Sequence, residues 1–345
     1  MRIVCAGDDF ISPDLFVEAL HRELGNGHEY VTDKSDWPHE PQHNSEEVRE
    51  WVGDETHLKE LLKGAHVLIT HCAPVTEQML ESAAELQLIS CCRGGPVNVN
   101  VGAATRHGIP VAYTPGRNGQ AVAEFTIGVM IAGMRRVYEG AEELKRGEWA
   151  GRLYAYDLTG VQLTGRTIGL VGLGQVGSRV ARLLRSFGCR VIGYDPYVDD
   201  DVFTELGVEI VDFDTLLERS DIVSLHPRLT QETRAMINRD TLARMRRGAY
   251  LVNTSRGPVV DQAALYEALE SGQLSGAALD TYEVEPPKPD DPLLRLPQVL
   301  PTPHIAGASQ EVAHRAARLA AAEVGRFLRG EPLLTCANPE VLKGR

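Results

Sequence analysis

The feature that most constrains this chain is a glycine-rich sequence near its middle. Gly172, Gly174 and Gly177 form a G-x-G-x-x-G pattern at the end of the apolar run Thr167–Gly172, and a helical pattern over Ser178–Phe187 follows at once. In a strand–turn–helix unit the first glycine permits a tight turn. The second lets a pyrophosphate approach the backbone, and the third allows the helix to pack closely on the strand. Free N–H groups at the helix start attract phosphate, so the pattern predicts a dinucleotide site.

The next strand supports this interpretation and favours one cofactor. Arg190–Tyr194 ends in Asp195, 18 residues after the last glycine. A carboxylate there can accept hydrogen bonds from the ribose hydroxyls of NAD and would repel the 2′-phosphate of NADP. We therefore expect NAD, with Gln175 and Val176 completing the binding loop. The alternative is a glycine-rich turn of another α/β fold with Asp195 as a solvated strand end, but the order of strand, glycines, helix, strand and acid weighs against it.

Strands alternate with helices along most of the chain. A length of 345 residues is long for one hydrophobic core, so two domains are expected. The alternation predicts an α/β fold of two Rossmann-like domains with parallel sheets covered on both faces. Because the motif begins near residue 170, the earlier residues must form something else, most simply a substrate domain. The expected strands are Arg2–Ala6, His66–Thr70, Leu86–Cys91, Pro110–Tyr113, Thr167–Gly172, Arg190–Asp195, Val208–Val211, Asp221–His226, Ala249–Thr254, Gly276–Asp280 and Val299–Pro301. The expected helical segments are Ser45–Lys63, Thr76–Ala84, Gly119–Gly147 and Gln310–Arg329, with a surface loop over Asp33–Ser45.

Composition excludes several other classes of protein. The formal net charge of −13, from 48 acidic and 35 basic residues, disfavours binding to nucleic acid or anionic lipid. No apolar run approaches the roughly 20 residues of a membrane span. The start of the chain predicts a strand and turn, with no signal peptide. The six cysteines show no metal-ligand spacing, so no metal is expected, and they fit a protein of the reducing cytoplasm.

Three chemically active residues follow predicted strands of the second half. Ligands of open parallel sheets bind beyond the carboxyl ends of the strands, where Arg256, Glu285 and His304 are expected. A histidine can take or give the hydroxyl proton while hydride moves to or from a nicotinamide. A carboxylate bonded to that histidine fixes its tautomer, and an arginine can hold a substrate carboxylate by two parallel bonds. Each residue alone could equally be a surface or loop residue; their joint placement after the dinucleotide motif favours a hydroxy-acid dehydrogenase.

The sequence resembles the D-isomer-specific 2-hydroxyacid dehydrogenase family, which contains phosphoglycerate, glycerate and D-lactate dehydrogenases. The resemblance implies Arg256 as the carboxylate binder and His304, paired with Glu285, as the acid/base. It implies that Asp280 lies near the nicotinamide carboxamide. It also implies a cofactor domain inserted into the substrate domain, with residues 1–118 and 310–345 as the substrate domain and 119–309 as the NAD-binding domain. The matching blocks are 169–177, 225–233, 251–261, 278–286 and 302–307, and His226 and Thr254 are implied near the cofactor.

The match loosens in the loop of residues 92–100, which the resemblance places on the substrate side. This chain has Gly94, Gly95 and Asn98 where many relatives have Gly-x-Gly-x-Asp-Asn. The amides of Gly94 and Gly95 can still bind a carboxylate, although a plain turn is the alternative. Arg228 also departs from the apolar residue or proline of many relatives. Four residues could meet a larger or phosphorylated acid, such as 3-phosphoglycerate, but are expected to be surface charges: His71, Arg93, Arg117 and Arg152.

Other functions on the same fold stay open at this point. An NAD-sensing regulator of the corepressor type would share all three residues, although the chain has no long disordered tails. The formate dehydrogenase branch would carry an amide in place of Glu285, whereas a phosphite-oxidising relative would keep the set. The helical region 119–150 resembles the family's dimerisation element, which implies a homodimer. The sequence leaves open which 2-hydroxy or 2-oxo acid is used.

Overall fold

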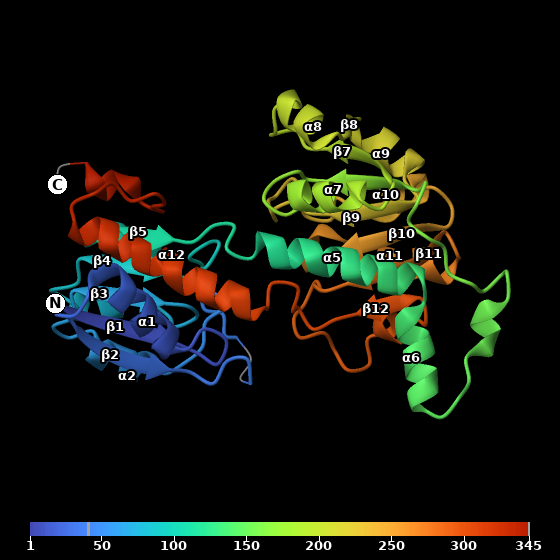
Figure 1. Cartoon of the computed structure of the whole chain (residues 1–345). Helices are drawn as coiled ribbons and strands as arrows, with labels where there is room; N and C mark the ends of the chain where they lie inside the picture. The colour runs from blue at the N-terminus through green and yellow to red at the C-terminus, as the bar shows by residue number, and fades with distance from the viewer. Residues whose placement is uncertain (40–41, 344–345) are drawn as a thin grey trace. The chain divides into compact units, whose positions relative to one another are not determined.

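The computed structural model describes residues 1–39 and 42–343, and the chain forms two compact units. Unit 1 comprises Met1–Arg117 and Ala308–Arg345, and unit 2 comprises Asn118–Gly307. Each unit has a parallel sheet with helices on both faces (Figure 1). The predicted fold class is therefore confirmed. Among the described residues, the helices include none of the length and apolarity that crossing a membrane requires.

The sheet of unit 1 has the order β2-β1-β3-β4-β5, with all neighbours parallel. The central strands read as continuous apolar runs because both faces are covered. Strand β2 escaped prediction because it is an edge strand whose sequence, EYVTDK, is polar and mostly exposed. The surface loop expected over Asp33–Ser45 therefore begins later than predicted, because Asp33 and Lys34 belong to β2. The strands are β1 (Arg2–Gly7), β2 (Glu29–Lys34), β3 (Val67–Thr70), β4 (Leu88–Cys91) and β5 (Val111–Tyr113).

Helices of unit 1 bury two apolar clusters, one on each face of the sheet. Helices α1 (Pro13–Leu24) and α12 (Gln310–Leu328) pack together on one face, where the alanines of α12 allow a close approach to Phe16. The other face carries α2 (Glu55–Leu61), α3 (Glu77–Ser82) and α4 (Val101–Arg106).

The prediction of one helix over Ser45–Lys63 is wrong before residue 55. The Asp54 side chain accepts hydrogen bonds from the amides of Thr56 and His57 and so starts α2 there. Glu50 has a left-handed backbone (φ 51°), which is incompatible with a continuous helix through the preceding residues.

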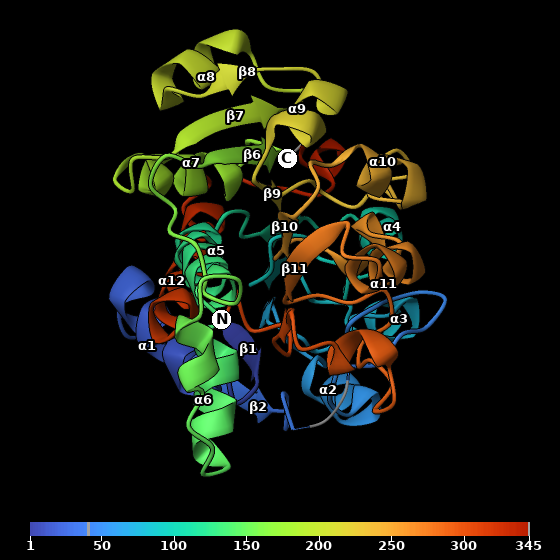
Figure 2. The ribbon, with the colours of Figure 1, turned by 90° about the vertical axis from the view of Figure 1, so that its right-hand side faces the viewer.

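The sheet of unit 2 has the order β12-β11-β10-β9-β6-β7-β8, again with all neighbours parallel. Figure 2 shows α5 (Gly119–Met134) and α7 (Gly177–Arg185) on one side of these strands, with α10 (Arg239–Arg244) and α11 (Gln262–Glu270) on the other. Two further helices are α8 (Asp200–Leu206) and α9 (Phe213–Arg219). The strands are β6 (Thr167–Val171), β7 (Arg190–Tyr194), β8 (Glu209–Ile210), β9 (Ile222–Leu225), β10 (Ala249–Asn253), β11 (Leu274–Leu279) and β12 (Val299–Pro301).

The helical stretch expected over Gly119–Gly147 is two helices, α5 and α6 (Val137–Lys145). Arg136 has a left-handed backbone (φ 52°), which interrupts the helix between α5 and α6. No glycine or proline marks this break, so the sequence pattern did not reveal it. The following segment is irregular apart from the short 3-10 helix η1 (Gly151–Tyr154).

Candidate active site

The glycine-rich turn joins β6 to α7, and two of its three glycines are required by the chain itself. Gly172 has φ 90°, and its amide donates to the Tyr194 carbonyl (2.9 Å). A Cβ on Gly177 would lie 2.0 Å from the Gly172 carbonyl oxygen. A Cβ on Gly174 would meet nothing within 4 Å, so its side of the turn is open. The open backbone at the start of a nine-residue helix fits the pyrophosphate of a dinucleotide.

Asp195, directly after β7, is bound to the same turn. Its Oδ2 accepts from the Leu173 amide (2.7 Å) and its Oδ1 from the Tyr197 amide (3.0 Å). A carboxylate has about four lone-pair sites, so both oxygens keep capacity for ribose hydroxyls. Gln175 is exposed beside Gly174, and its Oε1 accepts from Arg179 Nη1 (2.9 Å); Val176 caps α7.

Two residues expected near the cofactor follow β9 and β10. His226 Nε2 lies 3.0 Å from Ser224 Oγ, and its Nδ1 is buried without a partner among the described residues. Burial lowers the pKa of His226 to about 3, so the ring is neutral. An orphaned ring nitrogen fits a site completed by a bound molecule. Thr254 is buried and its Oγ1 lies 2.7 Å from Thr126 Oγ1, which ties the end of β10 to α5.

Asp280, at the end of β11, anchors the segment that carries His304. Its Oδ1 accepts from Thr302 Oγ1 (2.7 Å) and the Ile305 amide (2.9 Å), and its Oδ2 accepts from the Ala306 amide (2.8 Å). The side chain is buried, so these charge-assisted bonds are strong. The resemblance did not suggest this anchoring role.

His304 and Glu285 form a hydrogen-bonded pair. Glu285 Oε2 lies 2.6 Å from His304 Nδ1, and its Oε1 accepts from the Tyr282 amide (2.9 Å). Burial alone would lower the pKa of His304, but the bond and charge of Glu285 outweigh burial and raise it above its usual value. Burial alone would raise the pKa of Glu285. The contacts that oppose burial, led by the hydrogen bond to His304, outweigh it and lower the pKa below its usual value. Because Glu285 occupies Nδ1 and the His304 side chain is 45% exposed, Nε2 of this readily protonated imidazole is left for proton transfer.

Arg256 lies in the turn after β10, close enough that its charge lowers the pKa of Glu285 and opposes the rise at His304. Its guanidinium is exposed and makes one bond, from Nη1 to the Ser255 carbonyl (2.8 Å). Asn253 holds this turn, because its Nδ2 donates to the Arg256 carbonyl (3.1 Å). A Cβ on Gly257 would lie 1.7 Å from the Tyr282 carbonyl oxygen, so this turn packs against the Glu285 loop. Arg256, Glu285 and His304 therefore lie in one region of unit 2.

Several supporting residues were missed by sequence reasoning. Asn253 is the last residue of the buried strand β10, a position that signals a turn-forming side chain. Tyr282 donates from its hydroxyl to the carbonyls of Thr302 (3.0 Å) and Leu279 (3.2 Å), which joins the Glu285 and His304 loops. No local pattern distinguishes this tyrosine. Arg228 is exposed, and the structure offers no account of its side chain.

The loop after β4, which carries Gly94 and Gly95, lies in unit 1. Packing does not require glycine at either position, because a Cβ on Gly94 or Gly95 would meet nothing within 4 Å. Asn98 is buried and its Nδ2 donates to the Ala73 carbonyl (2.7 Å), so it holds this loop to the one after β3. Open glycine backbone at the carboxyl edge of a sheet fits a carboxylate ligand.

The expectation of four surface charges is wrong for three of them. His71 is 2% exposed, the Arg93 side chain is 13% exposed, and Arg117 has a fully buried guanidinium nitrogen without a partner. Tertiary packing of the loops after β3, β4 and β5 buries them, which local sequence does not show. Arg152 is 46% exposed, as expected, and contacts Glu139 (2.7 Å).

A parallel sheet with an open glycine turn, a strand-end aspartate and a nearby histidine–carboxylate–arginine set defines an NAD-dependent dehydrogenase. Residues 127–306 match the family described as D-isomer specific 2-hydroxyacid dehydrogenase, NAD binding domain. The chain belongs to the D-isomer-specific 2-hydroxyacid dehydrogenase family, as the sequence blocks predicted.

Known relatives agree with this assignment. The chain is 43% identical over 272 residues to a glyoxylate reductase of Korarchaeum cryptofilum, which covers 79% of this chain and 82% of that protein. It is 40% identical over 276 residues to a D-3-phosphoglycerate dehydrogenase of Methanocaldococcus jannaschii, covering 79% of this chain but 52% of that longer protein. The crystal structure of the TT0316 protein of Thermus thermophilus superimposes with a TM-score of 0.81 at 32% identity, covering 98% of this chain and 100% of that one.

Proposed function

We propose that this dehydrogenase reduces a short 2-oxo acid, of the glyoxylate or hydroxypyruvate type, to the corresponding 2-hydroxy acid, as the D-isomer where C2 is chiral. The 2.6 Å contact between His304 Nδ1 and Glu285 Oε2, in the unit that carries the glycine turn, is the observation that carries the proposal. When bound, NADH supplies the hydride that goes to C2. The residues of unit 2 proposed to hold it are Gly172, Gly174, Gln175, Val176, Gly177, Asp195, His226, Thr254 and Asp280.

In this proposal His304 delivers the proton. As the C2 carbonyl becomes an alkoxide, Nε2 of the imidazolium gives its proton to the oxygen and the ring becomes neutral. Glu285 keeps the ring oriented through Nδ1 and stabilises the charged form before transfer. The overall reaction consumes one hydride and one proton and yields the hydroxy acid and NAD. In the reverse direction the neutral ring accepts the hydroxyl proton.

Arg256 of unit 2 is proposed to hold the substrate carboxylate, and the Gly94–Gly95 amides of unit 1 are proposed as a further carboxylate-binding group. A guanidinium presents paired N–H donors that match a carboxylate, and the exposure of Arg256 leaves its fork accessible. The identity of 43% to a glyoxylate reductase, over 82% of that protein's length, supports a small acid. We further propose that unit 1 is the substrate domain and unit 2 the cofactor domain.

We also propose a homodimer formed through residues 119–150 and the segment that follows. Helix α6 and residues 146–161 extend from the rest of unit 2 (Figure 1). Glu139 of α6 joins the two by an ion pair with Arg152 (2.7 Å), and it also pairs with Arg136 (2.6 Å), the residue that precedes α6. This arm exposes large apolar side chains to a degree unusual for a monomer: Val137 (56%), Leu144 (58%), Trp149 (86%), Tyr154 (95%) and Tyr156 (92%).

The test is NADH oxidation with glyoxylate and hydroxypyruvate, comparing the protein with its His304→Ala and Arg256→Ala variants. We expect turnover by the protein and a loss of two or more orders of magnitude in each variant, with the NADH dissociation constant unchanged. Arg228→Ala, an exposed arginine of the same unit, is the matched control. Near-normal turnover by either active-site variant would refute the assigned roles. Tight NADH binding with no turnover of any 2-oxo acid would favour the NAD-sensing alternative.

A further inference from the structure

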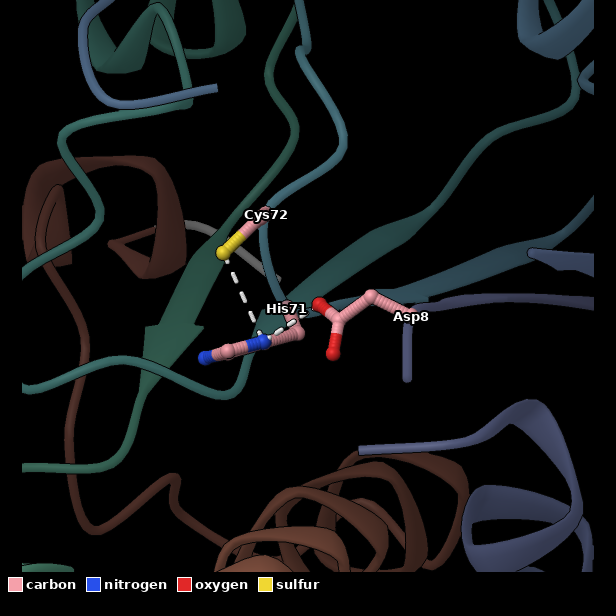
Figure 3. Close-up of side chains that lie close together, drawn as sticks. All are labelled: Asp8, His71 and Cys72. Carbon is pink, nitrogen blue, oxygen red and sulfur yellow. Dashed lines mark hydrogen bonds and ion pairs between the residues drawn. The ribbon is translucent and has the colours of Figure 1, made fainter. Parts of the chain in front are cut away.

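A buried polar cluster occupies the carboxyl edge of the sheet in unit 1. Asp8 follows β1, His71 and Cys72 follow β3, Arg93 follows β4, and Arg117 follows β5. The side chains of Asp8, His71 and Cys72 point toward one another (Figure 3). Four loops from neighbouring strands thus bring charged groups to the edge where open parallel sheets bind ligands.

Asp8 and Arg117 are joined through the imidazole of His71. Asp8 Oδ1 accepts from the amides of Phe10 and Ile11 (2.9 Å each), and its Oδ2 lies 2.6 Å from His71 Nδ1. Arg117 Nη2 lies 3.1 Å from His71 Nε2. A guanidinium only donates, so Nε2 must accept, and Nδ1 must carry the proton given to Asp8. His71 is therefore a neutral bridge; burial is the main reason that its pKa falls to about 4.

Arg117 is left with an unused donor. Across residues 1–39 and 42–343, no carboxylate lies within ion-pair distance of it, and its buried Nη1 has no hydrogen-bond partner. Arg93 differs, because its Nη1 donates to the Glu50 carbonyl (2.8 Å) and its Nη2 pairs with the Glu50 carboxylate. A buried donor without a partner is destabilising, because it has lost its hydrogen bonds to water and gained none. An anionic oxygen at Nη1 would supply the missing hydrogen bond.

A metal ion is a weaker occupant than an anion. Asp8, His71 and Cys72 offer ligand atoms within 4.8 Å of one another. Metal binding requires a thiolate, however, and burial raises the pKa of Cys72 to about 12. The guanidinium groups of Arg93 and Arg117, which also act on Cys72, would repel a cation.

The Arg117 loop is connected to the proposed substrate loop. The Thr114 amide donates to the Arg93 carbonyl (2.8 Å), which joins the chain after β5 to the chain just before Gly94. A ligand with one carboxylate on the Gly94–Gly95 amides therefore has a second anion site on the adjoining loop. The rings of Phe10 and Trp37 pack against the His71 ring, with their centroids 5.8 and 5.4 Å from its centroid. Because these rings hold the imidazole in place, we assign His71 the role of positioning Arg117.

We propose that Arg117 Nη1 binds a second anionic group of the substrate, a carboxylate or phosphate remote from C2, with His71 and Asp8 as positioning residues. The inference rests on the proposed function and extends its substrate class from short 2-oxo acids to 2-oxo acids that carry a second anionic group.

Matched substrate pairs test this on the unaltered protein. The first pair is 2-oxoglutarate and its 5-amide, and the second is 3-phosphohydroxypyruvate and hydroxypyruvate. We expect kcat/KM to favour the charged member at least tenfold in one pair, which also distinguishes a carboxylate from a phosphate. A ratio near one or below one in both pairs overturns the proposal.

The variant Arg117→Met should reduce that ratio to within threefold of unity, while the control Arg106→Met, an exposed arginine paired with Glu77 in the same unit, should keep it. Arg117→Lys serves if the methionine variant does not fold; one ammonium cannot reproduce both guanidinium contacts, so the ratio should fall at least threefold. An unchanged ratio in a folded Arg117 variant overturns the proposal.

Binding measurements separate this proposal from the proposed function. Calorimetry with glutarate and with inorganic phosphate is performed with NADH bound, so that the pyrophosphate site is filled. If no 2-oxo acid is turned over, the proposed function fails. Anion binding that is retained in Arg106→Met and lost in the Arg117 variant would still support the subsite. Absence of binding by both anions, or equal binding in all variants, would overturn it.

Discussion

Replacing Glu285 by glutamine tests the His304–Glu285 pair most directly. The amide oxygen can still accept from His304 Nδ1, although the amide nitrogen cannot replace Oε1 as the acceptor of the Tyr282 amide, and the negative charge 2.6 Å from the ring is removed. Burial and Arg256 both lower the pKa of His304, and Glu285 leads the contacts that oppose them. Without that charge the pKa should fall below the usual 6.5 of histidine.

The size of the fall follows from the geometry. A hydrogen bond to a charged group contributes about 1.5–3 kcal/mol and a neutral one about 0.5–1.5 kcal/mol. The two ranges differ by about 1–1.5 kcal/mol. The side chains are 45% and 35% exposed, so solvent screening places the difference near the lower end, about 1 kcal/mol. That corresponds to about 0.7 pKa unit.

The pH profile of glyoxylate reduction measures this fall. Reduction requires the imidazolium, so kcat/KM is retained below the pKa of His304 and lost as the pH rises through it. The midpoint in Glu285→Gln should move down by about 0.7 unit, with a rate about fivefold lower above both midpoints. Glu283→Gln, an exposed neighbour in the same loop, is the control and should leave the midpoint in place.

One result would refute this reasoning. If the Glu285→Gln midpoint equalled that of the parent protein or moved upward, while NADH binding was normal, Glu285 would not be the source of the raised pKa of His304. A loss of rate without any movement of the midpoint would instead indicate an orienting role alone.

Three further predictions concern the cofactor, the loop anchor and the dimer. Asp195→Ser should shift the kcat/KM preference toward NADPH by about tenfold or more, because removal of a like charge beside the 2′-phosphate is worth about 1.4 kcal/mol; an unchanged ratio contradicts the ribose contact. Asp280→Asn should lower the free energy of unfolding by about 2–4 kcal/mol in urea, since an amide cannot satisfy three donors to a buried carboxylate; a loss below 0.5 kcal/mol would count against the anchor. Leu144→Asp should convert a dimer to a monomer in light scattering, whereas the same substitution at exposed Ile210, outside the proposed interface, should not.

Much of the fold was predictable because its signals are local. Apolar runs and turn residues located eleven strands, and the glycine pattern marked the β6–α7 turn, because a single backbone conformation there demands glycine at positions 172 and 177. Strand β2 was missed because an edge strand needs no apolar run. The end of α5 was missed because Arg136 adopts its left-handed conformation without a sequence signal.

The sequence by itself determined the class of fold, the cofactor and the candidate residues Arg256, Glu285 and His304, since each follows a strand or motif that can be recognised in the chain. Only the tertiary structure decided what those residues contact. The Asp280 anchor joins a side chain at one strand end to the Thr302 hydroxyl, 22 residues later, and to the backbone amides of Ile305 and Ala306. The bridge from Asp8 through His71 to Arg117 spans still longer separations, so charges that local sequence places at the surface are buried together. Contacts of this kind depend on strand order in a folded sheet, which no local pattern encodes.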